Sequence, residues 1–240
     1  MAKCITAPAA TFVTSSDVWT RYVAPTLPVS FLREFLWDGR TPARGVSDAI
    51  IRSLLPALYG PGLILELGAA TDYYKRFAPS CQRYITSNIS PGCDIQLDMT
   101  TLNLPNHSAD SLVSVFALEH IYDFAAAINE QKRVLKPGGR LLLVVPFLYY
   151  YHAAPEDYFR FSGPALDRLL SPLRILVRQP IGDRWLLLAE MLHEKAIMGS
   201  RKGRFSRFAL RCLALPFLFA GLKAHDPQYA FGFAYLCEKV

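Results

Sequence analysis

Residues that could bind a ligand are found first around a short apolar run at 63–67. This run contains Glu66 and is followed by Gly68. A carboxylate at this place can accept hydrogen bonds from a ligand. A glycine after a strand permits a tight turn and lets a ligand approach the backbone closely. An ordinary turn between a strand and a helix explains the same pattern, so this motif alone does not define a function.

Candidate acid–base groups come later in the chain. Glu119 and His120 stand where a second apolar run, 112–118, ends. One of them could act as a base, but capping of the following helix is the interpretation that we favour. His152 has the chemistry of a general base, because an unperturbed histidine has a pKa of about 6.5. We therefore take Glu119, His120 and His152 as the catalytic candidates.

The segment around His152 is rich in aromatic side chains. Tyr151 and Tyr158 are candidates for an aromatic wall around a substrate, together with their neighbours Tyr149, Tyr150 and Phe159. Arg160 is the third substrate candidate. A pairing of Asp157 with Arg160 that pins the loop is the structural alternative, and the two interpretations are compatible.

Composition and charge exclude several classes of protein. The chain has 240 residues, is 52% hydrophobic and carries a formal net charge of +6, which suits one globular domain with additions. Residues 201–240 hold seven basic and two acidic side chains, so most of the positive charge is local to this end. A general nucleic-acid-binding surface is therefore not expected.

Cysteine and histidine spacing predicts neither a disulfide framework nor a metal site. The five cysteines are scattered without a C-x-x-C pair, and the five histidines form no H-E-x-x-H motif. The N-terminus lacks the apolar run of a signal peptide. The longest apolar run, 212–222, contains Pro216 and is shorter than the ~20 residues that span a bilayer. We expect a cytoplasmic protein with reduced thiols and no metal.

Strand and helix patterns alternate over the middle of the chain. Short helices are predicted at 30–37 and, from the four-residue spacing of Val46, Ile50, Leu54 and Leu58, before the first strand. The further expected elements are strands at 63–67, 84–89, 94–97, 112–118 and 140–145, and helices at 69–77 and from 124 to 135. We expect the motif Lys136-Pro137-Gly138-Gly139 to end the last of these helices in a turn.

This alternation predicts βαβ units and a parallel sheet. Ligands of such sheets bind beyond the carboxyl ends of the strands. The polar groups expected at that edge are Glu66 with Gly68, Asn88, Asp98 and the segment 116–120. Polar groups gathered at one edge of an apolar sheet predict a binding pocket.

With these motifs in their order, the chain resembles the class I S-adenosylmethionine-dependent methyltransferases of the small-molecule type. Glu66-Leu-Gly68-Ala-Ala70-Thr-Asp72 takes the place of the family's acidic residue and Gly-x-Gly-x-Gly. Arg133-Val-Leu-Lys-Pro-Gly-Gly-Arg-Leu142 is the most specific match. His152-x-x-Pro155-x-Asp157-Tyr158-x-Arg160-Phe161-Ser162 resembles a loop after the fifth strand in one branch of the family.

The resemblance implies an α/β, Rossmann-like, doubly wound sheet of seven strands with helices on both faces. The sheet should be mostly parallel, with an antiparallel last strand at 230–239 and a sixth strand at 173–177. Residues 1–60 would form an N-terminal arm and helices, and 61–240 the methyltransferase domain. A basic and apolar helical insert at about 183–224 would separate the last two strands.

The resemblance also implies the cofactor S-adenosyl-L-methionine. Glu66 and Gly68 would face its methionine part, Asn88 its ribose, and Asp98 with the Met99 backbone its adenine. The remaining cofactor-binding candidates are Ala70, Phe116 and Leu118. A turn cap before Thr100 is the alternative role of Asp98. Only one motif glycine is kept, which favours a second hypothesis, a catalytically weak or inactive methyltransferase-like binding or scaffold protein.

The acceptor is expected to be a small molecule or a lipid-like compound. Arg204, Arg207 and Arg211 would share one face of a helix, so residues 201–222 could contact a membrane peripherally. A solvated face packed on the sheet is the alternative. A nicotinamide oxidoreductase is disfavoured, because no G-x-G-x-x-G follows the first strand. The oligomeric state does not follow from the sequence.

Overall fold

The computed structural model describes residues 27, 30–80, 82–153, 155–193, 204–222 and 226–240. The predicted arm at 1–28 therefore lies almost entirely outside the described residues, as do Arg201 and Lys202 of the basic segment.

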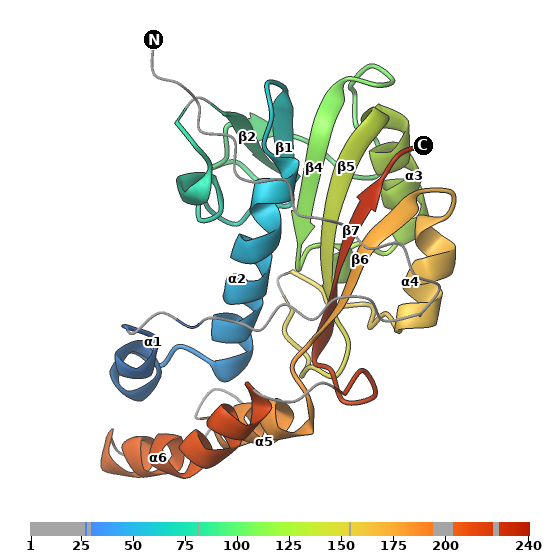
Figure 1. Cartoon of the computed structure of the whole chain (residues 1–240). Helices are drawn as coiled ribbons and strands as arrows, with labels where there is room; N and C mark the ends of the chain where they lie inside the picture. Colours follow the sequence, from blue (N-terminus) through green and yellow to red (C-terminus); the bar gives the residue numbers. More distant parts are fainter. Residues whose placement is uncertain (1–26, 28–29, 81, 154, 194–203, 223–225) are drawn as a thin grey trace.

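Seven strands form one sheet in the order β3-β2-β1-β4-β5-β7-β6 (Figure 1). Their bounds are β1 Leu63–Leu67, β2 Arg83–Asn88, β3 Ile95–Gln96, β4 Ala109–Val115, β5 Leu135–Pro146, β6 Arg174–Ile181 and β7 Gly232–Glu238. Pairings from β3 to β5 are parallel, whereas β7 runs antiparallel to both β5 and β6. The predicted mostly parallel, seven-stranded sheet with an antiparallel last strand is confirmed.

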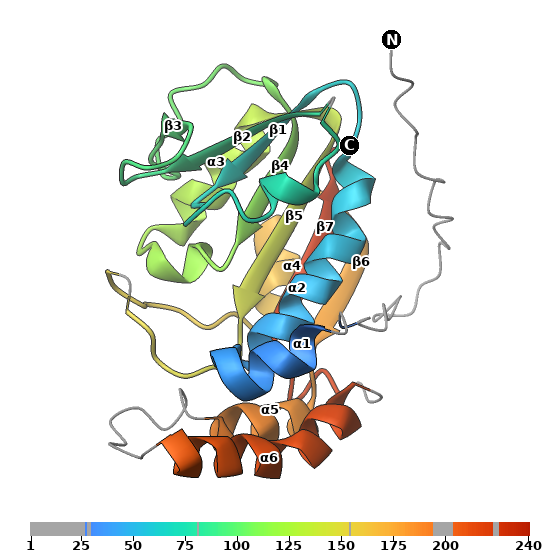
Figure 2. The ribbon, with the colours of Figure 1, turned by 90° about the vertical axis from the view of Figure 1, so that its left-hand side faces the viewer.

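Helices cover both faces and one end of this sheet (Figures 1 and 2). Helix α2 lies on one face, and α3 and α4 lie on the other. The α-helical bounds are α1 Ser30–Arg33, α2 Pro42–Leu54, α3 Phe124–Val134, α4 Gly163–Leu170, α5 Arg184–Leu192 and α6 Arg204–Gly221. Shorter turns are the π-helical η1 Glu34–Asp38 and the 3₁₀ segments η2 Leu55–Leu58, η3 Lys75–Phe77 and η4 Leu118–His120.

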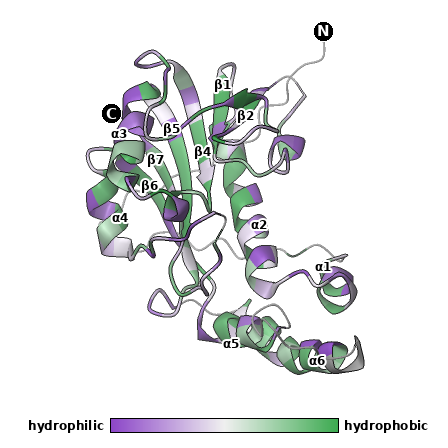
Figure 3. Cartoon of the chain, turned by 180° about the vertical axis from the view of Figure 1, so that it is seen from behind, coloured by the Kyte–Doolittle hydropathy of each residue, from purple (hydrophilic) through white to green (hydrophobic). Residues whose placement is uncertain are grey.

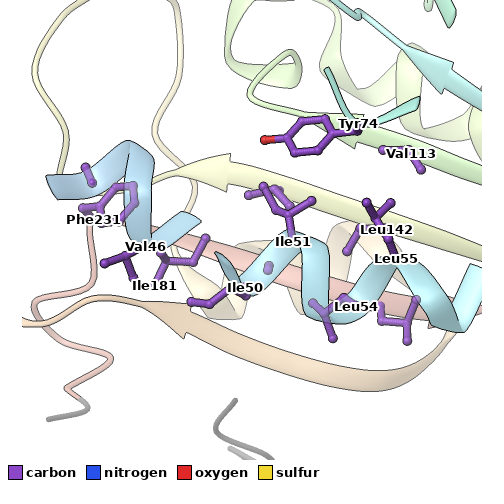
Figure 4. Close-up of a cluster of buried hydrophobic side chains, with 14 of the residues drawn as sticks. Val46, Ile50, Ile51, Leu54, Leu55, Tyr74, Val113, Leu142, Ile181 and Phe231 are labelled. Atoms are coloured by element: carbon purple, nitrogen blue, oxygen red, sulfur yellow. The ribbon is translucent and has the colours of Figure 1, made fainter. Parts of the chain in front are cut away.

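Alternation along the strands divides the core between the two faces. Leu142 and Val144 of β5 belong to the cluster that packs with α2, whose buried side chains are shown in Figure 4. Leu141 and Leu143 point the other way and pack with α3 and α4. Because α2 covers one of the two faces, it is an integral layer of the domain. The sequence pattern, in contrast, assigns α2 to the N-terminal part, residues 1–60, and predicts that the domain starts at residue 61.

The helix predicted at 69–77 does not form; bends lead instead into the single 3₁₀ turn η3. The Thr71 hydroxyl accepts a hydrogen bond from the Tyr73 backbone N–H at 3.2 Å, a local bond that competes with helical pairing. The Tyr74 hydroxyl donates to Asp48 of α2 at 2.8 Å. Tyr74 is buried there. Packing of this side chain against α2 therefore replaces the helix that the sequence predicted for this segment.

Strand β5 also begins five residues earlier than expected, at Leu135. The motif Lys136-Pro137-Gly138-Gly139 therefore lies within the strand and not in a free turn. The Gly138 N–H donates to the carbonyl of Lys239, and the Lys239 N–H donates to Gly139. Pairing with the C-terminal segment, which lies far away in sequence, supplies these bonds.

Helices α5 and α6 lie together at one end of the molecule (Figure 2), and both contain many hydrophobic residues (Figure 3). The exposed apolar surface, here called the α5–α6 surface, comprises Trp185, Leu188 and Met191 of α5 and Leu213 and Phe219 of α6. The predicted basic face is wrong for Arg211, which is buried and donates a hydrogen bond to the carbonyl of Leu36. Among the described helices, none is long and apolar enough to cross a bilayer.

Candidate active site

Glu66 is buried on β1, on the face that packs with α2. Its carboxylate accepts a hydrogen bond from the Tyr84 hydroxyl at 2.7 Å. Burial raises the pKa of Glu66 to about 7, against the opposing effects of this hydrogen bond and of the Arg44 charge. A nearby ligand cation would favour the charged form.

The turn after β1 needs glycine at one position only. Gly68 has φ of +73°, and a Cβ there would lie 2.5 Å from the Cβ of Ala117. Among the described residues, the non-glycine positions with positive φ do not include Ala70, so alanine suits that motif position. Asp72, at the third motif position, is exposed and lies 3.5 Å from Arg76.

Asn88 joins the ends of β1 and β2. Its side-chain amide donates to the carbonyl of Ala69 at 2.8 Å, and its side-chain oxygen accepts from the Ser90 N–H at 3.0 Å. The amide oxygen keeps a second lone pair that a ribose hydroxyl could use. Asn88 therefore has a structural role in the turn, and its predicted role at the ribose stays a prediction.

Asp98 and Met99 follow β3 at the next position along the same edge. One Asp98 oxygen accepts from the backbone N–H of Thr100 at 2.8 Å and from its hydroxyl at 2.7 Å, so the turn-cap alternative is realised. The Met99 side chain is buried against Gly68 and α3, and the predicted contact of its backbone with the adenine stays a prediction.

Phe116, the first residue after β4, has a strained backbone conformation. Its φ of +48° is uncommon for an aromatic residue, and strain of this kind clusters at functional sites. Leu118, two residues on, is fully buried in the core on the α3 face. Its place is in the core and not on a pocket wall, so it offers no surface to a ligand.

The loop after β5, residues 147–162, folds back onto the end of β4. The backbone N–H groups of Tyr158 and Phe159 both donate to the carbonyl of Glu119, at 2.9 and 3.3 Å. Arg160 forms a two-bond ion pair with Asp157 and also donates to the carbonyls of Tyr149 and Tyr150. The structural alternative, a loop pinned by this ion pair, is confirmed.

Pinning of the loop brings the three catalytic candidates together. Nε2 of His120 and Nε2 of His152 each lie 3.9 Å from Oε1 of Glu119, and the two rings are 5.1 Å apart. Glu119 is fully buried, and neither of its oxygens has a hydrogen-bond partner among the described residues. We call these residues the Glu119 cluster.

The expectation that the histidines form no ligand cluster is wrong here. The loop brings His152 next to His120 and Glu119, and this proximity cannot be read from the sequence spacing.

Burial dominates the charge states in the Glu119 cluster. It raises the pKa of Glu119 to about 8, although the Arg160 charge acts in the opposite direction. Burial also lowers the pKa of His152, against the effects of the Tyr150 carbonyl and Asp157. The pKa of Asp157 falls to about 2 because of its hydrogen bonds with Arg160. The neutral forms of Glu119 and His152 are thus favoured around pH 7.

The substrate candidates divide into two groups. Tyr151 and Tyr158 are exposed, and Tyr158 contacts the ring of Tyr122 at 5.4 Å. Both rings can therefore face a substrate. The guanidinium of Arg160 is committed to the loop, so the structure assigns it a positioning role.

Sequence reasoning missed Ile89, which stands beside Asn88 and is 61% exposed. An exposed aliphatic side chain at the end of β2 can cover the flat face of a nucleobase. The signal was present in the chain: an apolar residue next to the predicted ribose ligand, just before Ser90-Pro91-Gly92.

These groups fit S-adenosyl-L-methionine. The edge holds a buried carboxyl group, a side-chain amide and exposed aliphatic surface, which are the types of group that could contact the amino group, the ribose and the adenine. They belong to Glu66, Asn88 and Ile89. The left-handed Gly68 brings the ends of β1 and β4 into contact beside them.

Comparison with known families supports this fit. Residues 65–143 match the sequence profile of a family described as "Methyltransferase domain". The chain is 28% identical over 127 residues to a demethylmenaquinone methyltransferase of Mycobacterium marinum, which covers 47% of this chain and 55% of the relative. It is 47% identical over 45 residues to the ubiquinone/menaquinone biosynthesis C-methyltransferase UbiE of Caulobacter sp. (strain K31), covering 19% and 18% of the two chains. The chain thus matches about half or less of the length of these curated relatives.

Solved structures share the fold over most of the chain. An S-adenosylmethionine-dependent methyltransferase from Mesorhizobium loti aligns with a TM-score of 0.53 at 14% identity, over 82% of this chain and all of its own. The [4+2]-cyclase SpnF aligns with a TM-score of 0.57 at 15% identity, over 88% and 92%. The fold is thus the Rossmann-like architecture of class I methyltransferases. Within it, residues 65–143 resemble a methyltransferase domain.

Proposed function

We propose that this chain transfers a methyl group from S-adenosyl-L-methionine to a small, aromatic, lipid-like acceptor. The observation that carries the proposal is the gathering of Glu66, Gly68 and Asn88 at the carboxyl edge of the sheet. The Glu119 cluster lies at the end of β4, the strand next to β1. The candidate cofactor groups and the candidate acid–base groups thus follow the ends of adjacent strands.

When bound, the cofactor supplies an electrophilic methyl group, so the protein's main task is to orient the acceptor. Orientation can lower such a barrier by about 7–11 kcal/mol in favourable cases. Held by the pinned loop, the Glu119 cluster would receive the acceptor's polar group and its departing proton. Tyr151 and Tyr158 supply exposed ring surface beside it.

Two features support an apolar acceptor. The relatives are named as a demethylmenaquinone methyltransferase and a ubiquinone/menaquinone biosynthesis C-methyltransferase, so their acceptors are quinone-type molecules. The α5–α6 surface presents large apolar side chains to solvent, with Met191 66% exposed and Leu213 56%. We therefore propose that this surface rests on a membrane from which the acceptor is drawn. Apolar burial would drive that contact, in place of the basic face that the sequence predicted.

A methyltransferase-like protein that binds but does not turn over is the second candidate. It is favoured by one observation, the absence of a helix at 69–77, where bends and η3 replace it. A helix in that place would direct its N-terminus at the cofactor site. Turnover by the isolated chain would reject this candidate.

The test of the proposal is titration calorimetry of the full chain with S-adenosylhomocysteine. We expect one binding site per chain. No heat of binding at millimolar ligand would remove the proposal. Incubation with methyl-labelled cofactor and a cell extract then identifies the acceptor, and label in an organic-soluble aromatic product is the expected result. Binding without any labelled product would favour the second candidate.

A further inference from the structure

The two histidines of the Glu119 cluster have defined tautomers. Nδ1 of His120 contacts the carbonyl oxygen of Glu156, and Nδ1 of His152 lies 3.2 Å from the carbonyl of Tyr150 and 3.2 Å from Oδ2 of Asp157. A carbonyl or an ionised carboxylate can only accept, so each Nδ1 must donate. In the neutral rings the free lone pair is therefore on Nε2, the atom that faces Glu119.

The arrangement places three acceptor atoms around one space. Each Nε2 lies 3.9 Å from Oε1 of Glu119, and a ring nitrogen of His120, a ring nitrogen of His152 and a Glu119 oxygen all lie within 4.8 Å of one another. Glu119 is fully buried with both oxygens unpartnered, and a buried polar group without a partner is costly. A single proton on the carboxyl group could satisfy one of these lone pairs, whereas a cation satisfies all three.

We propose that the Glu119 cluster is a binding site for a divalent transition-metal ion of the zinc type. Two imidazoles and one carboxylate are a ligand set of open zinc sites, in which a fourth position is left for water or substrate. Nitrogen ligands disfavour Mg²⁺ and Ca²⁺, which prefer oxygen. The contacts of both Nδ1 atoms with carbonyl or carboxylate oxygens are those that orient metal-bound histidines.

Closure around an ion needs only a small movement. Ligand atoms bound tetrahedrally at about 2.1 Å are about 3.4 Å apart. The two Nε2–Oε1 distances are 3.9 Å, and the three ligand atoms lie within 4.8 Å of one another, so the ligand atoms would move by up to about 1 Å to enclose an ion. Glu119 and His120 belong to η4 and His152 to the loop, so the ion would also tie the loop to the sheet.

The role of the ion rests on the proposed function. An acceptor hydroxyl or enolate oxygen bound at the open position would be held beside the cofactor edge. The pKa of a bound hydroxyl would fall, so its proton would leave more readily near neutral pH, and the ion would stabilise the resulting enolate or phenolate oxygen. In this form of the site the histidines hold the ion and are not themselves the base.

The experiment is calorimetric titration of the chelator-treated full chain with Zn²⁺, and with Co²⁺ followed by visible absorption. We expect one ion per chain and the intense d–d bands of a four-coordinate Co²⁺ site. Glu119→Gln keeps the shape of the side chain but removes its charge, and should weaken Zn²⁺ binding by ~100-fold or more. His152→Gln should do the same, since both remove a direct ligand and not only an orienting group.

His107→Asn is the matched control, because His107 lies outside the cluster and asparagine tolerates its φ of +55°. This variant should bind Zn²⁺ as the wild type does. Absence of stoichiometric binding to the folded wild type, or binding that Glu119→Gln leaves unchanged, would overturn the proposal. Should a variant not fold, the wild-type Co²⁺ spectrum decides. S-adenosylhomocysteine titrated into metal-free protein tests the methyltransferase function separately, so either idea can fail alone.

Discussion

The hydroxyl of Tyr84 on β2 donates a 2.7 Å hydrogen bond to the buried carboxyl group of Glu66 on β1. The phenol is itself buried, and burial together with the Glu66 charge raises its pKa. A tyrosine is thus the partner of the acidic residue of the glycine motif. The carboxyl group is held in place before any ligand arrives, with a pKa that a ligand's charge can shift.

The first prediction concerns stability and pH at Glu66. Its pKa of about 7 in the native state lies above the value in the unfolded chain. The native state therefore holds a proton that the unfolded state has lost between about pH 4.5 and 7, and wild-type stability falls as pH rises through this window. Glu66→Gln does not titrate. Its free energy of unfolding relative to wild type should rise by ~2–3 kcal/mol from pH 4 to pH 8.

Urea unfolding of both proteins at the two pH values measures this effect. Glu130→Gln is a suitable control, because the ion pair with Arg133 lowers the pKa of Glu130. Its pH dependence should have the opposite sign. If the difference in free energy of unfolding between Glu66→Gln and wild type did not change with pH, the prediction would be contradicted.

The second prediction concerns Gly68. Gly68→Ala combines a φ of +73° with a Cβ contact of 2.5 Å to Ala117, so it should destabilise the domain by ~2–4 kcal/mol and weaken S-adenosylhomocysteine binding. Gly92→Ala, at φ +122° with nothing within 4 Å, carries strain without the contact and should cost about 1 kcal/mol. Equal melting temperatures for the two variants would show that the contact with Ala117 is unimportant.

A third prediction tests the pinning of the loop. Arg160→Lys keeps the charge but cannot form the two-bond pair with Asp157 and reach the carbonyls of Tyr149 and Tyr150 together. Amide hydrogen exchange over residues 147–162 should become faster by ~10-fold or more, which corresponds to about 1.4 kcal/mol. The exposed Arg168 on α4 provides the control Arg168→Lys, which should leave this exchange unchanged. Unaltered protection in Arg160→Lys would assign the loop's order to other contacts.

A fourth prediction tests the α5–α6 surface. Replacing Leu213 and Phe219 by asparagine removes two exposed apolar side chains, each worth up to ~1.5–3 kcal/mol if it enters a membrane. Sedimentation with phospholipid vesicles should show affinity reduced by at least about tenfold. Ile95→Asn, which changes an exposed residue of β3, should leave vesicle binding intact. Vesicle binding that survives the double replacement would rule this surface out as the contact.

The sequence by itself determined the alternating core and the order of motifs along it. β1 at 63–67 and the reversed last strand follow from local apolar runs and from family resemblance, which depend on neighbours in the chain. Candidate groups such as Glu66, Glu119 and His152 were named for the same reason, since residue type and position after a strand are local information.

Only the tertiary structure decided which of these groups meet. Tyr74 donates a hydrogen bond to Asp48 in place of the predicted helix. The 136–139 motif pairs with Lys239 near the chain end. Arg211 is buried and donates to the carbonyl of Leu36. His152 reaches Glu119 because a loop held by Asp157 and Arg160 folds back over 33 residues of chain. Contacts between segments far apart in sequence depend on which surfaces can be buried together, and local pattern does not carry that information.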